Sequence, residues 1–371
     1  MKMRMGQLLA MLLSVVAVPA MANDVVLDIE PTKETPRNSE GSFATLGDGR
    51  LLFCYTQFRG GANDNSAARI VGIESADGGK TWGAPREIIA NEGQSNVMSV
   101  TLLRLKSGRL AIFYLRKNSW TDCRPHVRTS DDDGVTWGAP VLVVAAPGYF
   151  VLNNDRVIQL AGGRLVVPVG FHRSRATDPG SAASFDSRAF DLWYLSDDEG
   201  KSWREAKSWW AIPVPSGSGL QEPGVVELPD QSLLCFARTD RGHQYEMRSR
   251  DRGETWSPPV SGPLASPTSP ASIKRIPGTS RLLAVYNDHS GKFPFPRGKR
   301  TPLVAALSDD GGASWHLHKA LETDPDGWYC YTAIHFMGDH VMLAYCAGDK
   351  VVGGLNRLRI RRVALKWLDG G

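Results

Sequence analysis

The chain has 371 residues, of which 42% are hydrophobic, 22% charged and 9% aromatic, so it has ample material for a buried core. Its 38 glycines and 23 prolines exceed average usage but are too few for a low-complexity chain, and the composition excludes collagen, coiled coils and disorder. The formal charge of +4 is small, which gives no reason to expect nucleic acid or an acidic membrane as a partner.

Residues 1–22 have the features of a signal peptide. Lys2 and Arg4 give a positive start, an apolar stretch runs from Leu8 to Val18, and Ala20-Met21-Ala22 matches a small-residue cleavage site. The apolar stretch is shorter than the about 20 residues that span a membrane. We therefore expect the chain to be exported to the periplasm or secreted, without a membrane span.

The sequence contains five cysteines, Cys54, Cys123, Cys235, Cys330 and Cys346. Export permits disulfides, but an odd number leaves at least one thiol free. The spacings do not match those of a zinc site, so we expect neither a zinc site nor a thiol nucleophile. No cofactor is expected.

A short pattern of the form Ser-x-Asp-x-Gly-x-Thr/Ser-Trp recurs five times. The copies are Ser75–Trp82, Ser130–Trp137, Ser196–Trp203, Ser249–Trp256 and Ser308–Trp315. In each copy we expect a tight turn in which the Ser and Asp side chains bond the backbone, the Gly adopts a positive φ and the Trp packs beneath. The acidic run in the second copy superficially resembles a calcium loop. It lacks the closing glutamate of an EF-hand, and the other copies do not keep it, so we interpret the boxes as structural turns.

A second kind of turn alternates with these boxes and leads into an apolar strand, as in Asp48-Gly49-Arg50-Leu51. Six such turns, flanked by runs of β-branched and aromatic residues, predict six four-stranded units over residues 23–371. The architecture is therefore an all-β, six-bladed β-propeller in a single domain. We expect residues 358–368 to form the outer strand of the sixth blade, with Asp24 to Ile29 joining that blade to close the ring. A β-sandwich or an eight-stranded barrel would not explain the long repeat.

A propeller places its functional site on the axis, where the innermost strands converge. The charged and polar side chains next to those strands are Arg37, Arg59, Asp64, Glu222, Arg238, Arg300 and Tyr331. Three polar segments, at 94–100, 115–124 and 152–156, are further candidates for a sugar-binding wall, with turn capping as an equally good explanation for the last.

With these residues and boxes the chain resembles the sialidase (neuraminidase) superfamily, exo-acting glycosidases built on six-bladed propellers with Asp boxes. The segment TQFRGGANDNSAARIV supplies Arg59 and Asp64 at the family's spacing of five residues. The segment LQEPGVVELPDQSLLCFARTD supplies a Glu and an Arg, Glu222 and Arg238, on either side of a strand–turn–strand.

The remaining motifs also follow in the family's order, with one departure. KRTPLVAALSDDGGASW supplies Arg300 before the last box, and CYTAIHF supplies Tyr331 followed by Thr332. The family has Arg-Ile-Pro before its first blade, whereas this chain has Arg37 without Ile-Pro. Glu40, three residues later, is a further candidate for the pocket.

The resemblance implies a site for an acidic sugar. A sialic acid carries a carboxylate on its anomeric carbon, and three guanidinium groups, those of Arg37, Arg238 and Arg300, would clamp this anion. The same carboxylate would repel an anionic nucleophile, and sialidases use a neutral tyrosine instead. In this chain the corresponding residue is Tyr331.

The resemblance also assigns the proton transfers. A tyrosine has a pKa near 10 and needs a base within reach, for which Glu222 is the candidate. Asp64 would protonate the leaving oxygen and then activate water, which gives retention of configuration. Arg59 would contact a ring hydroxyl.

Three functions follow from these features. The first is an exo-α-sialidase acting as a monomer on an acidic glycan, without a metal. The second keeps the fold and a hydrolase or lyase reaction but changes the sugar to a uronic acid, another keto-sugar acid or rhamnose, because the Arg37 region is altered. The third is a carbohydrate-binding propeller without catalysis, which would have no need of Asp64, Glu222 and Tyr331 together.

Overall fold

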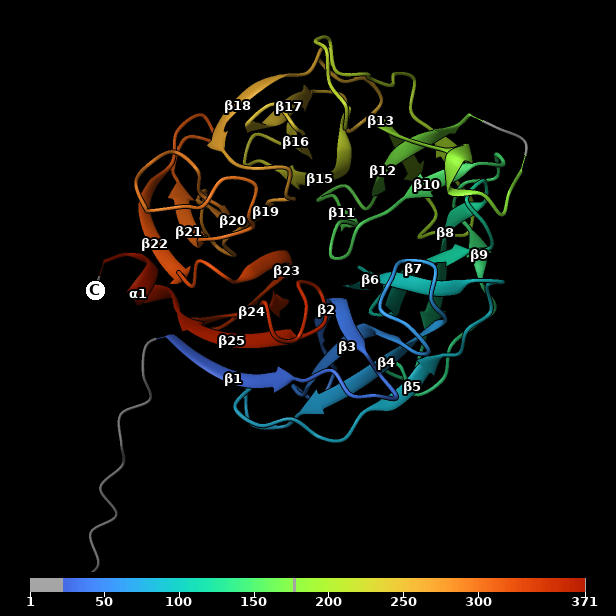
Figure 1. Ribbon diagram of the computed structural model, residues 1–371, viewed down its shortest axis with the longest axis horizontal. Helices are drawn as coiled ribbons and strands as arrows, with labels where there is room; N and C mark the ends of the chain where they lie inside the picture. The colour runs from blue at the N-terminus through green and yellow to red at the C-terminus, as the bar shows by residue number, and fades with distance from the viewer. Residues whose placement is uncertain (1–22, 176–177, 371) are drawn as a thin grey trace, which may run out of the picture.

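The computed structural model describes residues 23–175 and 178–370, so the expected leader peptide lies outside the described residues. Antiparallel four-stranded units follow one another around a ring, with the innermost strands β2, β6, β11, β15, β19 and β23 facing the centre (Figure 1). This arrangement confirms the predicted six-bladed β-propeller. Where the structure describes the chain, no helix is both long and apolar enough to cross a membrane.

The blades are numbered in chain order and described from the innermost strand outward. The first blade contains β2 (Arg37–Thr45), β3 (Leu51–Phe58), β4 (Ala68–Ser75) and β5 (Arg86–Ile89). The second contains β6 (Asn96–Arg104), β7 (Leu110–Lys117), β8 (Cys123–Ser130) and β9 (Val141–Leu142). The third contains β11 (Ile158–Gln159), β12 (Leu165–Ser174), β13 (Phe185–Ser196) and β14 (Arg204–Glu205). The strand β10 (Tyr149–Val151) pairs with β8 and β12 and joins these two blades into one nine-stranded sheet.

The second half of the chain is more regular. The fourth blade contains β15 (Gln221–Glu227), β16 (Leu233–Arg238), β17 (His243–Ser249) and β18 (Val260–Ala265). The fifth contains β19 (Ser272–Arg275), β20 (Leu282–Asn287), β21 (Leu303–Ser308) and β22 (His316–Glu322). The sixth contains β23 (Trp328–Met337), β24 (His340–Gly348), β25 (Leu358–Ala364) and β1 (Asn23–Ile29).

The buried core lies between blades rather than at the centre of the ring. The buried apolar residues of the described chain fall into six clusters. Five of them combine side chains from two adjacent blades, and the sixth joins the second and third blades and adds Phe58 and Ala68 of the first. Leu52 and Tyr114, for example, meet between the first and second blades, while Phe53 and Met342 meet between the first and the last. Both faces of a middle strand are therefore covered, which explains why every residue of β3 is buried.

The two ends of the chain meet in the sixth blade. The strand β1 pairs antiparallel with β25, which confirms that the segment after residue 23 closes the ring. The expected outer strand over 358–368 is wrong in two respects. The strand β25 ends at Ala364 and is followed by the short helix α1 (Leu365–Leu368), and β1 rather than β25 is the outermost strand. Because β1 occupies the outermost position of the blade, the residues after β25 are not needed as a strand and form α1 instead.

The five boxes are hydrogen-bonded turns. In the first, Ser75 Oγ donates to Asp77 Oδ1 at 2.9 Å and accepts from the Gly79 N–H at 2.9 Å. The N–H and hydroxyl of Thr81 donate to the two oxygens of the same carboxylate. The other boxes repeat the Ser–Asp and Gly–Ser bonds. Each box Gly has a positive φ, as at Gly79 with 80°. The box aspartates therefore stabilise the turns by accepting hydrogen bonds within them.

Candidate active site

A cavity of about 310 Å³ lies among the innermost strands, and side chains from all six blades line it. Its polar lining consists of Glu40, Asp64, Ser99, Asn153, His172, Gln221, Glu222, Arg238, Arg300 and Tyr331. Its apolar lining consists of Met98, Leu115, Cys123, Tyr149, Val151, Phe185 and Leu355. A separate cavity of about 230 Å³ near Arg156 and Lys274 contains none of the predicted catalytic residues. The larger cavity is therefore the candidate active site.

Irregularities in the innermost strands aim side chains into this cavity. Glu40, Ser99, Glu222 and Tyr331 have φ values of 57°, 60°, 52° and 60°. Each of them coincides with a register shift between its strand and the next strand of the blade. Such a bulge re-aims a side chain, and a positive φ costs a non-glycine residue about 1–3 kcal/mol. The innermost strands of four blades contain such a strained residue, and in each case its side chain lines the cavity.

Side chains from other blades hold these bulges in place. The Asn154 amide donates from Nδ2 to the Gly41 carbonyl oxygen at 2.8 Å and to the Tyr331 carbonyl oxygen at 3.0 Å. The Ser99 N–H donates to Thr56 Oγ1 at 3.1 Å. One amide of the third blade thus fixes the backbone of the first and the sixth.

The polar segment 152–156 has a structural role as well. The Asp155 carboxylate accepts from the Ser42 hydroxyl at 2.9 Å and from the Ile334 N–H at 2.9 Å, and it pairs with Lys274 Nζ at 2.7 Å. These partners come from three other blades, so the segment ties the ring together across its centre.

The first group in the cavity is built around the phenol of Tyr331. Its hydroxyl donates to Glu222 Oε1 at 3.1 Å, and Arg238 donates from an Nη to Glu222 Oε2 at 2.9 Å. The Arg300 guanidinium carbon lies 5.4 Å from the centroid of the Tyr331 ring. Burial opposes the charge of Glu222, but Arg238 and Arg300 outweigh it and lower the pKa of that carboxyl.

The pKa of Tyr331 shifts in the opposite direction from that of Glu222. Burial, and then the Glu222 carboxylate, raise the pKa of Tyr331 far above its ordinary value, although Arg300 and Arg238 work against both. The group therefore holds a neutral phenol in contact with an ionised carboxylate, which is the arrangement for transferring the phenolic proton.

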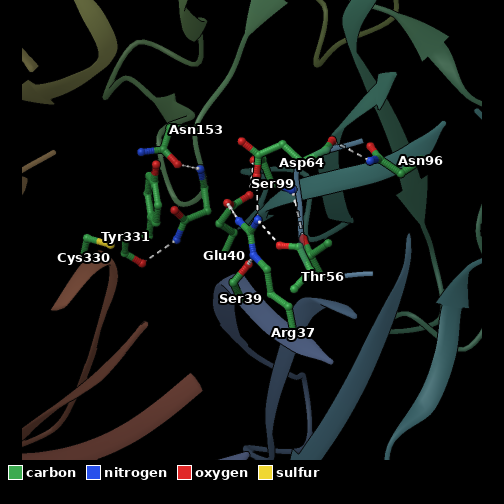
Figure 2. Close-up of polar contacts among 12 residues, drawn as sticks. Arg37, Ser39, Glu40, Thr56, Asp64, Asn96, Ser99, Asn153, Cys330 and Tyr331 are labelled. Atoms are coloured by element: carbon green, nitrogen blue, oxygen red, sulfur yellow. Dashed lines mark hydrogen bonds and ion pairs between the residues drawn. The ribbon is translucent and has the colours of Figure 1, made fainter. Parts of the chain in front are cut away.

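The second group is built around Arg37, whose guanidinium points toward Glu40, Asp64 and Ser39 (Figure 2). Its guanidinium donates to Glu40 Oε1 at 2.8 Å, to Asp64 Oδ1 at 2.6 Å and to Ser39 Oγ at 3.0 Å. The other Glu40 oxygen accepts from the Ser99 hydroxyl at 2.6 Å. The side chain of Arg37 is 2% exposed, whereas that of Asp64 is 60% exposed.

These contacts set the protonation of both carboxyls. For Asp64, the loss of solvation within the cavity is the largest influence and opposes the charge although the side chain stays accessible, but Arg37 outweighs it and lowers the pKa. For Glu40, burial prevails over the attraction of Arg37 and raises the pKa. The cavity thus contains one exposed carboxylate that is easily ionised and one buried carboxyl that is not.

The loop that carries Asp64 is anchored from beneath. Lys117 is 0% exposed, and its ammonium donates to the Asp64 carbonyl oxygen at 3.1 Å while lying 4.8 Å from the Trp120 ring and 5.2 Å from the Tyr149 ring. The Asn96 amide donates to the same carbonyl oxygen at 2.9 Å. Because its backbone is held, the Asp64 side chain can extend toward the cavity without the loop being displaced.

The chain is similar in sequence and in fold to known proteins. The BNR repeat-like domain family matches residues 49–343, which is most of the chain. This chain belongs to that family. It spans about half the length of the curated relatives it matches. A sialidase of Micromonospora viridifaciens is 23% identical over 322 residues, which cover 77% of this chain and 46% of the relative. A sialidase of Bacteroides fragilis is 25% identical over 323 residues, which cover 76% of this chain and 55% of the relative.

Solved structures show the same fold. A leech intramolecular trans-sialidase superposes with a TM-score of 0.71 at 16% identity, covering 95% of this chain and 71% of the other. The Hadza microbial sialidase Hz136 superposes with a TM-score of 0.69 at 21% identity, covering 90% and 67%. Together with the curated sialidases, they confirm the resemblance stated from the sequence. The chain therefore shares the propeller fold of these sialidases.

Five of the seven predicted site residues line the cavity, whereas Arg37 and Arg59 do not. Tyr331, Glu222, Asp64, Arg238 and Arg300 all line the cavity. The Arg37 guanidinium lies behind Glu40 and Asp64, which occupy its donors, and it is not part of the lining. Arg59 is exposed at the end of β3 and also lies outside the lining, because the loop closed by its N–H and the Ala67 carbonyl presents Asp64 instead.

The candidate segments 94–100 and 152–156 contain the lining residues Met98, Ser99 and Asn153, although none of these three was assigned to the pocket, and Tyr149 and Phe185 on the apolar side were missed. A usable signal existed for Ser99. Glu40, Ser99 and Glu222 each lie eleven residues before the leucine that opens the second strand of the blade. A spacing measured from the turn would have found the position although the residue type differs. The apolar side has no comparable signal, because its residues look like ordinary strand residues.

Proposed function

We propose that this protein is an exported, exo-acting, retaining glycosidase that removes a terminal acidic sugar, most simply an α-linked sialic acid, from glycans. The observation that carries the proposal is the hydrogen bond from the Tyr331 hydroxyl to Glu222 at 3.1 Å, inside a cavity that also presents Arg238 and Arg300. A tyrosine paired with a carboxylate has no evident use in a purely binding site.

The first half of the reaction forms a bond between Tyr331 and the sugar. The phenolic oxygen attacks the anomeric carbon while its proton passes to Glu222, so no anionic nucleophile approaches the substrate carboxylate. Arg238 and Arg300 hold that carboxylate. The Nε of Arg238 is buried without a hydrogen-bond partner among the described residues, so this guanidinium has a donor to offer a ligand.

The second participant is Asp64. It gives a proton to the leaving oxygen, and it then takes one from the water that releases the sugar from Tyr331 while Glu222 returns the phenolic proton. Two displacements on one carbon retain its configuration. Because Asp64 is paired with Arg37 at 2.6 Å, it starts as a carboxylate. The donating form therefore requires that this pair open and that the carboxyl take up a proton.

One observation favours a second substrate class. Glu40 lines the cavity and lies where a third guanidinium was expected to face the ligand. A carboxyl at this place accepts hydrogen bonds from hydroxyl groups and opposes a second negative charge. A uronic acid or another keto-sugar acid with a hydroxyl directed at Glu40 would fit the same pair of arginines.

The test is hydrolysis of fluorogenic sugars by the purified protein and by Tyr331→Phe, which removes only the hydroxyl. Tyr194→Phe is a matched control, since the Tyr194 hydroxyl bonds Glu205 outside the cavity. We expect the wild type and the control to release sialic acid and Tyr331→Phe to be inactive. Full activity of Tyr331→Phe would remove the nucleophile. Release of a uronic acid alone would select the second class, and binding without release would select the carbohydrate-binding propeller.

A further inference from the structure

Two buried cysteines face each other beside the nucleophile. Cys330 on β23 and Cys346 on β24 are directly opposite partners in the antiparallel register, and they are 1% and 0% exposed. Each thiol also influences the pKa of the other. Directly opposite residues have Cβ atoms about 4.5–5.5 Å apart, and a disulfide needs about 3.5–4.5 Å. A small approach of the two strands is sufficient to join these sulfurs.

The same sulfur touches the anion-binding side of the cavity. An Nη of Arg300 donates to Cys330 Sγ at 3.0 Å, while the guanidinium also faces the ring of Tyr331. Burial disfavours the Cys330 thiolate, but Cys346 and the charge of Arg300 outweigh it and lower the pKa of Cys330. Burial, and then Cys330, raise the pKa of Cys346. Cys330 therefore loses its proton more readily than Cys346.

We propose that Cys330 and Cys346 are a modification site that closes into a disulfide when the chain folds in the presence of a disulfide oxidant. The other three cysteines lie on β3, β8 and β16 and stay as thiols. The resulting bond joins the innermost strand of the sixth blade to its neighbour, one residue before Tyr331.

The reaction balances with one oxidant molecule of the class R–S–S–R. The Cys330 thiolate attacks one oxidant sulfur, breaks the S–S bond and releases a first thiolate, which leaves a mixed disulfide on Cys330. Cys346 loses its proton and attacks the Cys330 sulfur, and the second thiolate leaves. The two protons of the cysteines end on the two released R–SH molecules, the cysteines are oxidised and the oxidant is reduced. Because both sulfurs are buried in the finished fold, the oxidant reaches them during folding or local opening of β23 and β24.

Oxidation also changes what Arg300 can bind. Cys330 Sγ occupies a donor of Arg300, for which a substrate carboxylate would compete, whereas a disulfide sulfur cannot ionise to hold that guanidinium. We expect the Arg300 donor to be available to an anion in the oxidised form, so that KM falls by about threefold to tenfold on oxidation. This consequence rests on the proposed function, whereas the disulfide itself does not.

The disulfide is tested by mass. The full chain is unfolded, reduced and refolded with oxidised and reduced glutathione, then alkylated in denaturant and digested. We expect three of the five thiols to be alkylated, an intact mass lower by two hydrogens, and one linked peptide pair that contains Cys330 and Cys346. Cys346→Ser should show no loss of mass, while Cys54→Ala, on the first blade, should show the same loss as the wild type. Five alkylated thiols in the wild type, or a link between other cysteines, would overturn the proposal.

The effect on the site is read separately, as KM for a fluorogenic sialoside before and after reduction. The wild type should lose affinity on reduction, and Cys346→Ser should not respond. If the protein hydrolyses no sialoside, the mass measurement still decides whether the disulfide exists, so the two proposals fail independently. A disulfide that leaves KM unchanged would contradict the competition between Cys330 and the substrate for Arg300.

Discussion

The outer boxes and the axial bulges of this propeller both contain a residue with a positive φ, but they place it differently. A box such as that of Asp77 satisfies its Ser, Asp and Thr side chains within one turn and gives the positive φ to a glycine. A bulge such as that of Tyr331 gives the positive φ to a residue with a large side chain and depends on Asn154 from another blade. Both are repeated around the ring.

This contrast distinguishes positions that stabilise the fold of a repeat protein from positions that form its functional site. The boxes keep the same residue types in five copies, because each copy solves the same local problem. The bulges keep their place but change their residue, from Glu40 to Ser99, Glu222 and Tyr331, because each side chain has its own task in one shared cavity. Substitutions should therefore affect stability at the boxes and catalysis at the bulges.

The largest loss of catalysis is expected from Glu222→Gln. The amide keeps the size of the side chain but cannot accept the phenolic proton, so we expect kcat to fall by about 100- to 10,000-fold with a small change in thermal stability. Glu227→Gln at the other end of β15, where Glu227 accepts from the Ala161 N–H, is the matched control and should keep its kcat. A loss of stability without a loss of kcat in Glu222→Gln would make the bulge a structural feature like a box.

Arg300→Lys tests whether the cavity holds an anion. A lysine keeps the charge but cannot form two parallel bonds to a carboxylate, so we expect KM for an acidic sugar to rise by about 10- to 100-fold with kcat nearly unchanged. Arg281→Lys, which alters a guanidinium paired with Asp309 and Asp369 at the outer edge, should leave KM unchanged. A fall in kcat at constant KM would instead assign Arg300 to the chemical step.

The fold was predictable because its signals are local. The boxes and the Gly-containing turns each specify their own backbone, and their alternation counts the blades. The error at 358–368 arose because α1 and the outer position of β1 depend on how the two ends of the chain meet, and a short apolar run such as LKWL fits a helix as well as a strand.

The site was predictable only in part, because its residues are defined by long-range contacts. Glu222 and Tyr331 meet across 109 positions of the chain, and only a family pattern suggests the pairing. Whether Arg37 faces the ligand depends on Glu40 and Asp64 taking its donors, which spacing does not reveal. Lys117 reads as an ordinary strand residue although it is completely buried beneath Asp64.

The pH dependence of the reaction tests the second group of the cavity. Burial opposes the charge of Asp64, but Arg37 outweighs it and lowers the pKa of this carboxyl. The protonated acid therefore becomes scarce as the pH rises through this lowered pKa, already below the ordinary range of an aspartate. We expect kcat/KM for a substrate with a sugar leaving group to fall by about tenfold per pH unit on this limb. On the acid limb, kcat/KM should fall as Glu222 becomes protonated. Arg238 and Arg300 lower the pKa of Glu222 although burial opposes its charge. We therefore expect the pH optimum in the acidic range.

Asp64→Asn separates this explanation from a general effect of pH. An aryl leaving group needs little protonation, so the variant should lose much less activity on an aryl glycoside than on a glycoside with a sugar leaving group, and its alkaline limb should flatten. Equal losses on both substrates would show that Asp64 is not the proton donor.

The smallest effect is expected at a box, and it should appear in stability alone. In the fifth box the Asp310 carboxylate accepts from the Ser308 hydroxyl at 2.8 Å and from the Ser314 N–H and hydroxyl at 2.9 and 2.6 Å. Asp310→Ala removes these bonds, and we expect the free energy of unfolding to fall by about 1–2 kcal/mol with kcat/KM unchanged. Chemical denaturation and the fluorogenic assay measure the two quantities.

The sign of the pH effect at this box follows from its hydrogen bonds. The bond from the Ser314 hydroxyl is the largest of the influences that lower the pKa of Asp310 to about 2, below the value of about 3.9 for an unfolded aspartate. The stabilisation is therefore complete above the unfolded value and is lost as the pH falls toward 2. The gap in stability between the wild type and Asp310→Ala should accordingly narrow in acid. If the gap stayed constant with pH while kcat/KM fell, the box would act on the cavity, and the division between edge and axis would fail.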